Sequence, residues 1–124
     1  MTYPEPCGLE CGAGWKNIID RTHEKLKYID PDYKIAQIKE KFGGLRYYFD
    51  PSFDYGSIQV DIMDDIVRAA EYEASITCEL CGVHGQLNGV ETRVDHYWYY
   101  TYCKECSDKA ISDRNERFKN DLEL

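Results

Sequence analysis

Four cysteines occur as two closely spaced pairs in the second half of the chain, in the stretches CELC (78–81) and CKEC (103–106), which are separated by 21 residues. Two thiolates with this spacing can point at one ion, and two such pairs complete the tetrahedral set of four sulfur ligands that suits Zn²⁺. Gly82 follows the first pair, where the turn around a metal needs a permissive backbone. The second pair begins a predicted helix, whose N-terminal amides stabilise thiolates. We therefore predict one zinc site, formed by Cys78, Cys81, Cys103 and Cys106.

The predicted zinc site is structural, because four protein ligands leave no open position for water or substrate. Cys7 and Cys11 lie outside it and are interpreted as free thiols or core residues, although with a nearby histidine they would also suit a second metal. We expect His84 and His96 to occupy ordinary loop and strand positions. We expect His23 to lie at the surface or boundary of a helix.

The composition is that of an ordinary globular protein, since 43% of the 124 residues are hydrophobic and 31% are charged. The net charge of −8 disfavours binding to nucleic acid unless the cations are gathered into a patch, and it suits a basic partner. The sequence shows neither a secretory signal nor a stretch as long as a membrane span. With cysteines spaced as metal ligands, these features predict a cytoplasmic protein without membrane association.

Hydrophobic periodicity predicts three helices and two pairs of strands. The first helix lies within residues 12–32 and ends at Asp30-Pro31. Two strands, within 33–42 and 45–49, surround a predicted Gly43-Gly44 turn. A second helix over about 58–75 has one predicted inward stripe: Ile58, Ile62, Met63, Ile66, Val67, Ala69 and Ala70. Short strands follow within 85–102, and a third helix spans about 104–120.

These elements predict a single α+β domain over residues 1–124. Residues 1–76 form a helix–hairpin–helix part, in which helices pack on a small sheet centred on the hairpin. Residues 77–124 form a zinc-binding module in which a cysteine knuckle, a hairpin and a helix follow one another, the order found in treble-clef zinc modules.

The predicted hairpin KEKFGGLRYYF (39–49) has two chemically different faces. Alternation places Glu40 on the inner face, together with the apolar residues Ile38, Phe42, Leu45, Tyr47 and Phe49. The outer face carries Lys39, Lys41, Arg46 and Tyr48. A buried carboxylate needs a partner, so Glu40 is expected to meet a cation, a tyrosine hydroxyl or backbone amides.

Charge is polarised along the chain. Residues 33–49 carry a net charge of +3, whereas residues 50–79 carry eight acids and one arginine, a net charge of −7. The acids of the second helix, among them Asp61, Asp64 and Asp65, are either a solvated helix face or an acidic docking surface. The outer hairpin face is either a solubilising surface or, with Tyr97, Trp98 and Tyr99, a site for a phosphate-bearing ligand or an acidic loop of a partner.

Several stretches give the chain a resemblance to a family of small, mostly uncharacterised zinc-binding proteins of phages, prophages and bacteria. They are a Cys-Gly-x-Gly-Trp opening (11–15), QIKEKFGGLRYY (37–48), AAEYEAS (69–75) and TCELCG (77–82) with a distal cysteine pair. Relatives of this type often end the zinc site with histidine, where this chain has Cys106. The resemblance implies a zinc-containing α+β domain and no particular activity. A phage origin makes inhibition of a host or anti-phage defence protein an expectation.

The sequence favours a non-enzymatic binding protein with a protein partner. The alternative is a nucleic-acid-binding zinc protein that uses the Lys/Arg/Tyr face of the hairpin. An enzyme needs an acid, base or nucleophile in a pocket, and the best set is Glu40 with Tyr47 and His23. No motif links these three residues, so we expect no catalytic residues.

Overall fold

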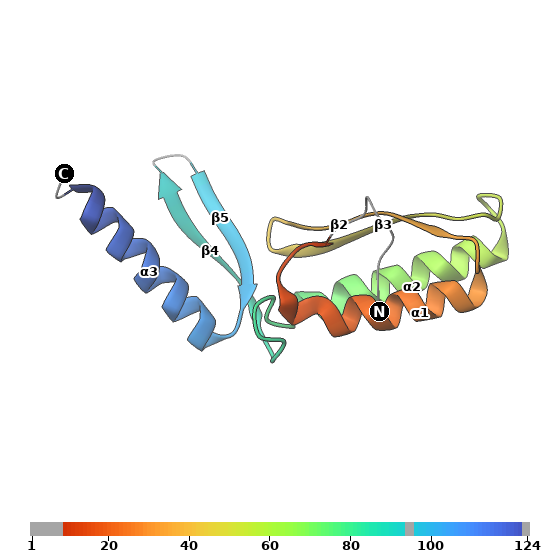
Figure 1. Ribbon diagram of the computed structural model, residues 1–124, viewed down its shortest axis with the longest axis horizontal. Coiled ribbons are helices and arrows are strands. Elements are labelled where there is room, and N and C mark those ends of the chain that lie inside the picture. Colours follow the sequence, from red (N-terminus) through yellow and green to blue (C-terminus); the bar gives the residue numbers. More distant parts are fainter. Residues whose placement is uncertain (1–8, 94–95, 123–124) are drawn as a thin grey trace.

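The computed structural model describes residues 9–93 and 96–122, and it confirms the predicted α+β class with a C-terminal cysteine module (Figure 1). The helical elements are η1 (Ala13–Trp15), α1 (Lys16–Ile29), α2 (Ile58–Ser75) and α3 (Lys104–Leu122). The strands are β1 (Leu9–Glu10), β2 (Lys34–Lys41), β3 (Gly44–Asp50), β4 (Gln86–Arg93) and β5 (His96–Tyr102). Within the described residues, no helix is both long and apolar enough to cross a membrane.

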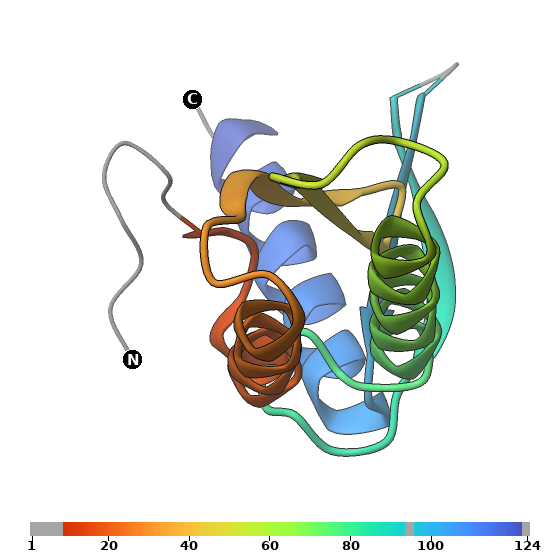
Figure 2. The ribbon, with the colours of Figure 1, turned by 90° about the vertical axis from the view of Figure 1, so that its right-hand side faces the viewer.

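The strands β1 to β3 and the helices α1 and α2 make two layers. β2 and β3 pair antiparallel, and β1, which the sequence pattern does not predict, adds to β2 in parallel. Both helices lie on the same side of this sheet, so its other side faces away from them (Figure 1, Figure 2). β4 and β5 form a second antiparallel sheet, which leads into α3 at the far end of the molecule.

The β2–β3 turn consists of Phe42 and Gly43, so the predicted Gly43-Gly44 turn is wrong by one residue. Both turn residues have positive φ, 54° and 81°, and Lys41 pairs with Gly44, as in a type I′ hairpin. Long-range contacts select this turn, because a Cβ on Gly43 would stand only 2.5 Å from Leu87 of β4. The tip of the hairpin therefore packs on the β4–β5 sheet, and local turn propensities contain no information about this contact.

The shifted turn leaves the alternation of the two hairpin faces unchanged, because it moves the partner of each β2 residue by two positions along β3. Ile38, Leu45 and Tyr47 are buried in the core formed with the helices. Phe42, predicted inside, lies in the turn and is 67% exposed. Glu40 is half-buried rather than buried, and its Oε2 accepts the amide of Gly43 at 3.1 Å.

The buried face of α2 differs from the predicted stripe. The buried residues of α2 are Val60, Met63, Val67, Ala70 and Ala74. Ile58, Ile62 and Ala69 are exposed and Ile66 is half-buried, so that part of the stripe prediction is wrong. The periodicity misleads because α2 carries apolar residues on two opposite faces, and only packing decides which of them meets the sheet.

A row of hydrogen-bonded polar side chains crosses the apolar core. His23 of α1 is 8% exposed, and its Nδ1 hydrogen-bonds to the hydroxyl of Tyr33, which lies 2.8 Å from the hydroxyl of Tyr47. The predicted surface or boundary position of His23 is therefore wrong. The helical spacing explains this result, because residue 23 shares a face with the buried Ile19 and Leu26.

Glu79 joins the segment that precedes α1 to the cysteine module. Gly14 N donates to Glu79 O at 2.6 Å, and Gly12 N donates to its carboxylate Oε2 at 2.7 Å. Next to these bonds, Trp15 Nε1 donates to Thr77 O at 2.8 Å. We call these contacts of residues 12–15 with residues 77–79 the junction, and they place the first cysteine pair beside the start of α1.

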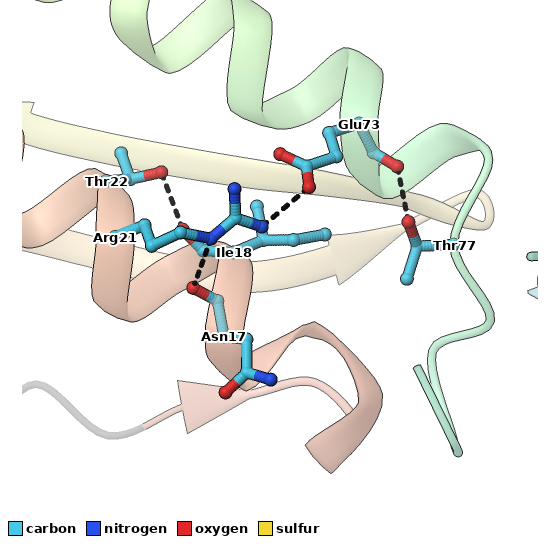
Figure 3. Close-up of polar contacts among 6 residues, drawn as sticks. All are labelled: Asn17, Ile18, Arg21, Thr22, Glu73 and Thr77. Carbon is cyan, nitrogen blue, oxygen red and sulfur yellow. Dashed lines mark hydrogen bonds and ion pairs between the residues drawn. The ribbon is translucent and has the colours of Figure 1, made fainter. Parts of the chain in front are cut away.

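Three further contacts extend the junction. Thr101 of β5 is 1% exposed; its Oγ1 donates to Gly43 O at 2.6 Å, and its carbonyl accepts Glu79 N at 2.9 Å. Figure 3 shows Arg21 of α1 reaching Glu73 of α2, at 2.6 Å. The hairpin tip and the end of α2 are thus both fixed close to the cysteine module.

Replacing Gly14 by alanine is expected to disrupt the junction. A Cβ at this position would stand 2.2 Å from Cys78 O and 2.6 Å from the backbone of Glu79, which cannot move without moving the first cysteine pair. We expect Gly14→Ala to lower the free energy of unfolding by about 2 kcal/mol or more, measured by urea unfolding. Gly44→Ala is the control, because its nearest neighbour is 3.5 Å away. Equal losses in both variants would contradict the close contact at Gly14.

The buried imidazole predicts a pH dependence of stability. Burial and the nearby charge of Lys27 lower the pKa of His23, against the opposing effects of Asp20 and Glu24. The unfolded chain therefore binds a proton at a higher pH than the folded chain, so stability falls as the pH drops below about 6.5. In urea unfolding, the wild type should lose more stability than His23→Gln between about pH 7.5 and about pH 5.5. Both proteins share the zinc ligands, so parallel profiles would contradict the prediction.

Candidate metal centre

The first cysteine pair lies on a tight turn between α2 and β4. Cys78 N donates to Val83 O at 2.6 Å, and Gly82 N donates to Cys78 O at 2.9 Å. Gly82 has a φ of 84°, which a residue with a side chain rarely adopts, and this explains glycine directly after the pair. Thr77 and His84 form a bridge that closes the base of the turn. The turn brings Cys78 and Cys81 to the same side.

The second cysteine pair lies where β5 meets α3. Cys103 precedes the helix, and Cys106 lies in its first turn. Cys106 N points to Cys103 Sγ at 3.5 Å, and Ser107 N donates to Cys103 O at 2.9 Å. The amide of Cys106, at the start of α3, therefore points at the sulfur of Cys103, where it favours negative charge.

The two pairs meet in one cluster. The Sγ atoms of Cys78, Cys81, Cys103 and Cys106 all lie within 4.8 Å of one another, and those of Cys81 and Cys103 are 3.7 Å apart. With a zinc–sulfur distance of about 2.3 Å, two ligands of a tetrahedral site lie about 3.8 Å apart. The cluster therefore has the dimensions of a four-thiolate zinc site, as the sequence spacing predicts. It is the one cluster of this kind among the described residues.

The electrostatics of the thiols fit a cation at the centre of the cluster. Burial raises the pKa of Cys78, but backbone hydrogen bonds from Cys103, Cys81 and Leu80 outweigh it and bring this pKa to about 7. In contrast, the neighbouring thiol of Cys103, followed by burial, raises the pKa of Cys106 to about 12. One thiol thus ionises readily, while the last holds its proton unless a cation compensates the charge of its neighbours. Zn²⁺ supplies that charge.

The side chains beneath the cluster form a small core of their own. Cys78 is fully buried, and it packs with Tyr100 and Tyr102, whose rings lie 4.5 Å apart. The Tyr100 hydroxyl lies 3.0 Å from Ser107 Oγ, which ties β5 to the first turns of α3. Burial and the charge of Glu79 raise the pKa of Tyr102 to about 12, so its hydroxyl stays neutral.

The other cysteines and histidines do not join this cluster in the described structure. Cys11 is half-buried at the edge of the main core, and burial, with Glu79 and Glu40, raises its pKa to about 11. His84 is exposed on the loop after the first pair. Cys7 and the side chain of His96 lie outside the described residues and side chains.

The residues predicted for a binding surface separate into two layers. Lys39, Lys41, Arg46 and Tyr48 share the face of the β2–β3 hairpin opposite to that of the buried Ile38. Tyr99 of β5 lies near the hairpin tip, with its ring 6.5 Å from the ring of Phe42, and the side chains of Tyr97 and Trp98 lie outside those described. Asp61 and Asp65 are exposed and Asp64 half-buried on α2, in the helical layer.

Two residues that position the site escape prediction from the sequence, Glu79 and Thr101. Each lies close to a zinc ligand, and each bonds to the first half of the chain. The pattern Gly-x-Gly at 12–14 is the signal that remains in the sequence, because both glycines lack room for a side chain next to Glu79. Its partner is 65 residues away from Gly14 and therefore invisible to local patterns.

Comparisons with protein-family models, curated proteins and solved structures gave no significant match. Of the resemblance to phage and bacterial zinc proteins, the four-cysteine cluster is supported by the structure, and the family itself stays a prediction. The fold and the site together define a small α+β zinc-binding protein with one structural four-cysteine site.

The zinc prediction has a direct test in metal content. Protein purified without chelator should contain one Zn²⁺ per chain, and Cys106→Ser should lose it, because three thiolates hold zinc less tightly than four. Cys11→Ser, which removes a thiol outside the cluster, should keep it. Elemental analysis gives the zinc content, and circular dichroism after chelation at neutral pH reports the expected unfolding of residues 77–124. Unchanged spectra, or full zinc in Cys106→Ser, would refute the structural site.

Proposed function

We propose that this protein is a zinc-stabilised binding protein, and that it docks an acidic segment of a partner protein on the outer face of its first hairpin. This surface, formed by Lys39, Lys41, Arg46 and Tyr48, is called the cationic hairpin face. The observation that carries the proposal is its register: Lys39 lies directly opposite Arg46, and Lys41 and Tyr48 extend the same face on either side.

Lys41 is exposed on this face, and Lys39 and Arg46 are half-buried. None of the ion pairs between described residues involves Lys39, Lys41 or Arg46. Lys39 Nζ lies 5.9 Å from the ring centre of Tyr48, and Lys41 Nζ lies 5.6 Å from that of Phe42. Rings that accompany the cations give the face apolar contact area as well as charge, the combination found at the centre of protein interfaces.

Contacts on the inner side of the two strands and at their turn hold this face in place, which reduces the conformational entropy lost on binding. Ile38, Leu45 and Tyr47 anchor the inner side of the strands in the core. Glu40 fixes the turn from within the hairpin, and Thr101 fixes it from β5. A ligand would therefore meet strands that are already ordered, and less of the binding free energy would be spent on ordering them.

The proposal includes no catalytic step. A zinc ion with four protein ligands has no position for a substrate. Of the three residues that form the best catalytic set in the sequence, His23 and Tyr47 are buried and hydrogen-bonded through Tyr33, while Glu40 bonds to the turn. The alternative of nucleic-acid binding uses the same face, and the net charge of −8 works against it. Inhibition of a host or defence protein of bacteria rests on the sequence resemblance alone.

The experiment compares partners retained from a bacterial lysate by immobilised protein variants. Lys39→Glu/Lys41→Glu/Arg46→Glu should lose a partner that the wild type retains, with affinity reduced about tenfold or more, since each exposed ion pair contributes roughly 0.5 kcal/mol. Mass spectrometry identifies the retained proteins, and titration calorimetry then measures the affinity of the purified partner.

The matched control is Lys25→Glu/Lys27→Glu/Lys109→Glu, which changes the net charge equally at exposed lysines outside the cationic hairpin face. It should retain the partner, and so should Asp61→Asn/Asp64→Asn. Loss of the partner with the acidic pair alone would move the docking surface to α2, and identical profiles for all variants would refute both surfaces. If nuclease treatment abolishes retention, the nucleic-acid alternative replaces the proposal.

A further inference from the structure

The outward side of α2 carries residues at a regular spacing. Positions 58, 62, 65, 69, 72 and 76 advance in steps of four and three residues, the spacing of the contact line between two helices of a coiled coil. We call this line the α2 seam; its residues are Ile58, Ile62, Asp65, Ala69 and Tyr72 of α2 and Ile76, which directly follows the helix. Val60, Val67 and Ala74, at the opposite position of the heptad, are all buried. The seam therefore points away from the core of its own chain.

The α2 seam is exposed along its length. Ile58 and Tyr72 are each 70% exposed, Ile62 is 46% exposed and Ile76 is 42% exposed. Beside it, α1 and α2 border a groove of about 290 Å³, lined by Ile18, Arg21, Lys25, Ile62, Ile66 and Ala69 among others. Arg21 reaches Glu73 across this groove (Figure 3). A protruding apolar line next to a groove offers knobs and holes to a facing helix.

We propose that the α2 seam packs against the α2 seam of a second copy of this chain, with the two helices antiparallel. With Ile58 opposite the second copy's Ile76, Ile62 lies opposite its Tyr72 and Asp65 opposite its Ala69. A parallel pair would instead place the two Asp65 carboxylates against each other in the seam, which costs free energy. The antiparallel arrangement is a closed twofold dimer, in which both copies use the same surface.

Charge complementarity identifies the occupant as a second copy. Asp65 is the one charged residue of the seam, and Arg68 flanks it; within one chain the two lie 3.8 Å apart and both are 77% exposed. In the antiparallel pair, Arg68 lies next to Ala69, which faces the second copy's Asp65. Two acids and two arginines then alternate around the twofold axis. A purely apolar helix would bury Asp65 with only its own Arg68 beside it, whereas a second copy adds a second arginine next to the carboxylate.

The dimer would leave both cationic hairpin faces accessible. The helices lie on one side of the β2–β3 sheet and the cationic hairpin face on the other (Figure 1, Figure 2). Joining two copies through their helices therefore turns the two cationic hairpin faces outward. The inference does not depend on the proposed function, because the two surfaces share no residue.

The test is the mass in solution of charge variants, measured by analytical ultracentrifugation. The wild type should be a dimer. Asp65→Arg gathers four arginines at the axis and Arg68→Asp gathers four acids, so each variant should be monomeric. An equimolar mixture of the two variants should form a heterodimer, and the double swap Asp65→Arg/Arg68→Asp should restore the homodimer. A partner other than a second copy would not produce this reciprocal rescue.

Two further variants separate loss of the interface from loss of the fold. Ile62→Glu introduces a charge at an exposed seam position and should abolish the dimer with an unchanged circular dichroism spectrum and zinc content. Tyr48→Glu, at a similarly exposed position on the cationic hairpin face, should leave the dimer intact. A monomeric wild type, a dimer that persists in Ile62→Glu, or mixed charge variants that fail to associate would each overturn the proposal.

Discussion

The bond between Gly14 N and Glu79 O is the contact on which the rest of the structure depends. It holds η1 so close to the first cysteine pair that position 14 has no room for a side chain. Glu79 lies between the zinc ligands Cys78 and Cys81, so the metal fixes the residue that joins the two ends of the molecule. The zinc ion therefore stabilises more than its own module, because the start of α1 is attached to one of its knuckles.

The same arrangement couples the metal centre to the first hairpin. Thr101 lies two residues before the ligand Cys103, and it holds the turn residue Gly43 while its carbonyl binds Glu79. The turn has strained positive φ at Phe42, which a hairpin adopts when contacts around it compensate the cost. Here the compensation comes partly from Glu40 and partly from β5. A carboxylate on the inner face thus stabilises the turn through the amide of Gly43.

The sequence predicts the parts of this structure that local chemistry determines. The cysteine spacing is sufficient to predict the zinc cluster, because two CxxC loops in one small domain are typical of a zinc site. The bounds of α2 follow from its periodicity, but its buried face does not, since apolar residues lie on both sides. The turn position, the burial of His23 and the roles of Glu79 and Thr101 depend on residues far away in sequence. Local patterns contain no information about those contacts.

The solvent-facing apolar residues of α2 make part of the predicted inward stripe wrong, but they also indicate an interface. A face of isoleucines open to water is an aggregation hazard in a monomer, and natural proteins limit such hazards with charges placed inside the apolar surface. Asp65 is such a charge, and it prevents apolar surfaces in general from covering the seam without penalty. Within one chain Arg68 lies 3.8 Å from Asp65, and an antiparallel copy would add a second arginine beside the same carboxylate. Because both copies are acidic, with a net charge of −8 each, long-range repulsion opposes their association, and screening by salt should strengthen the dimer rather than weaken it.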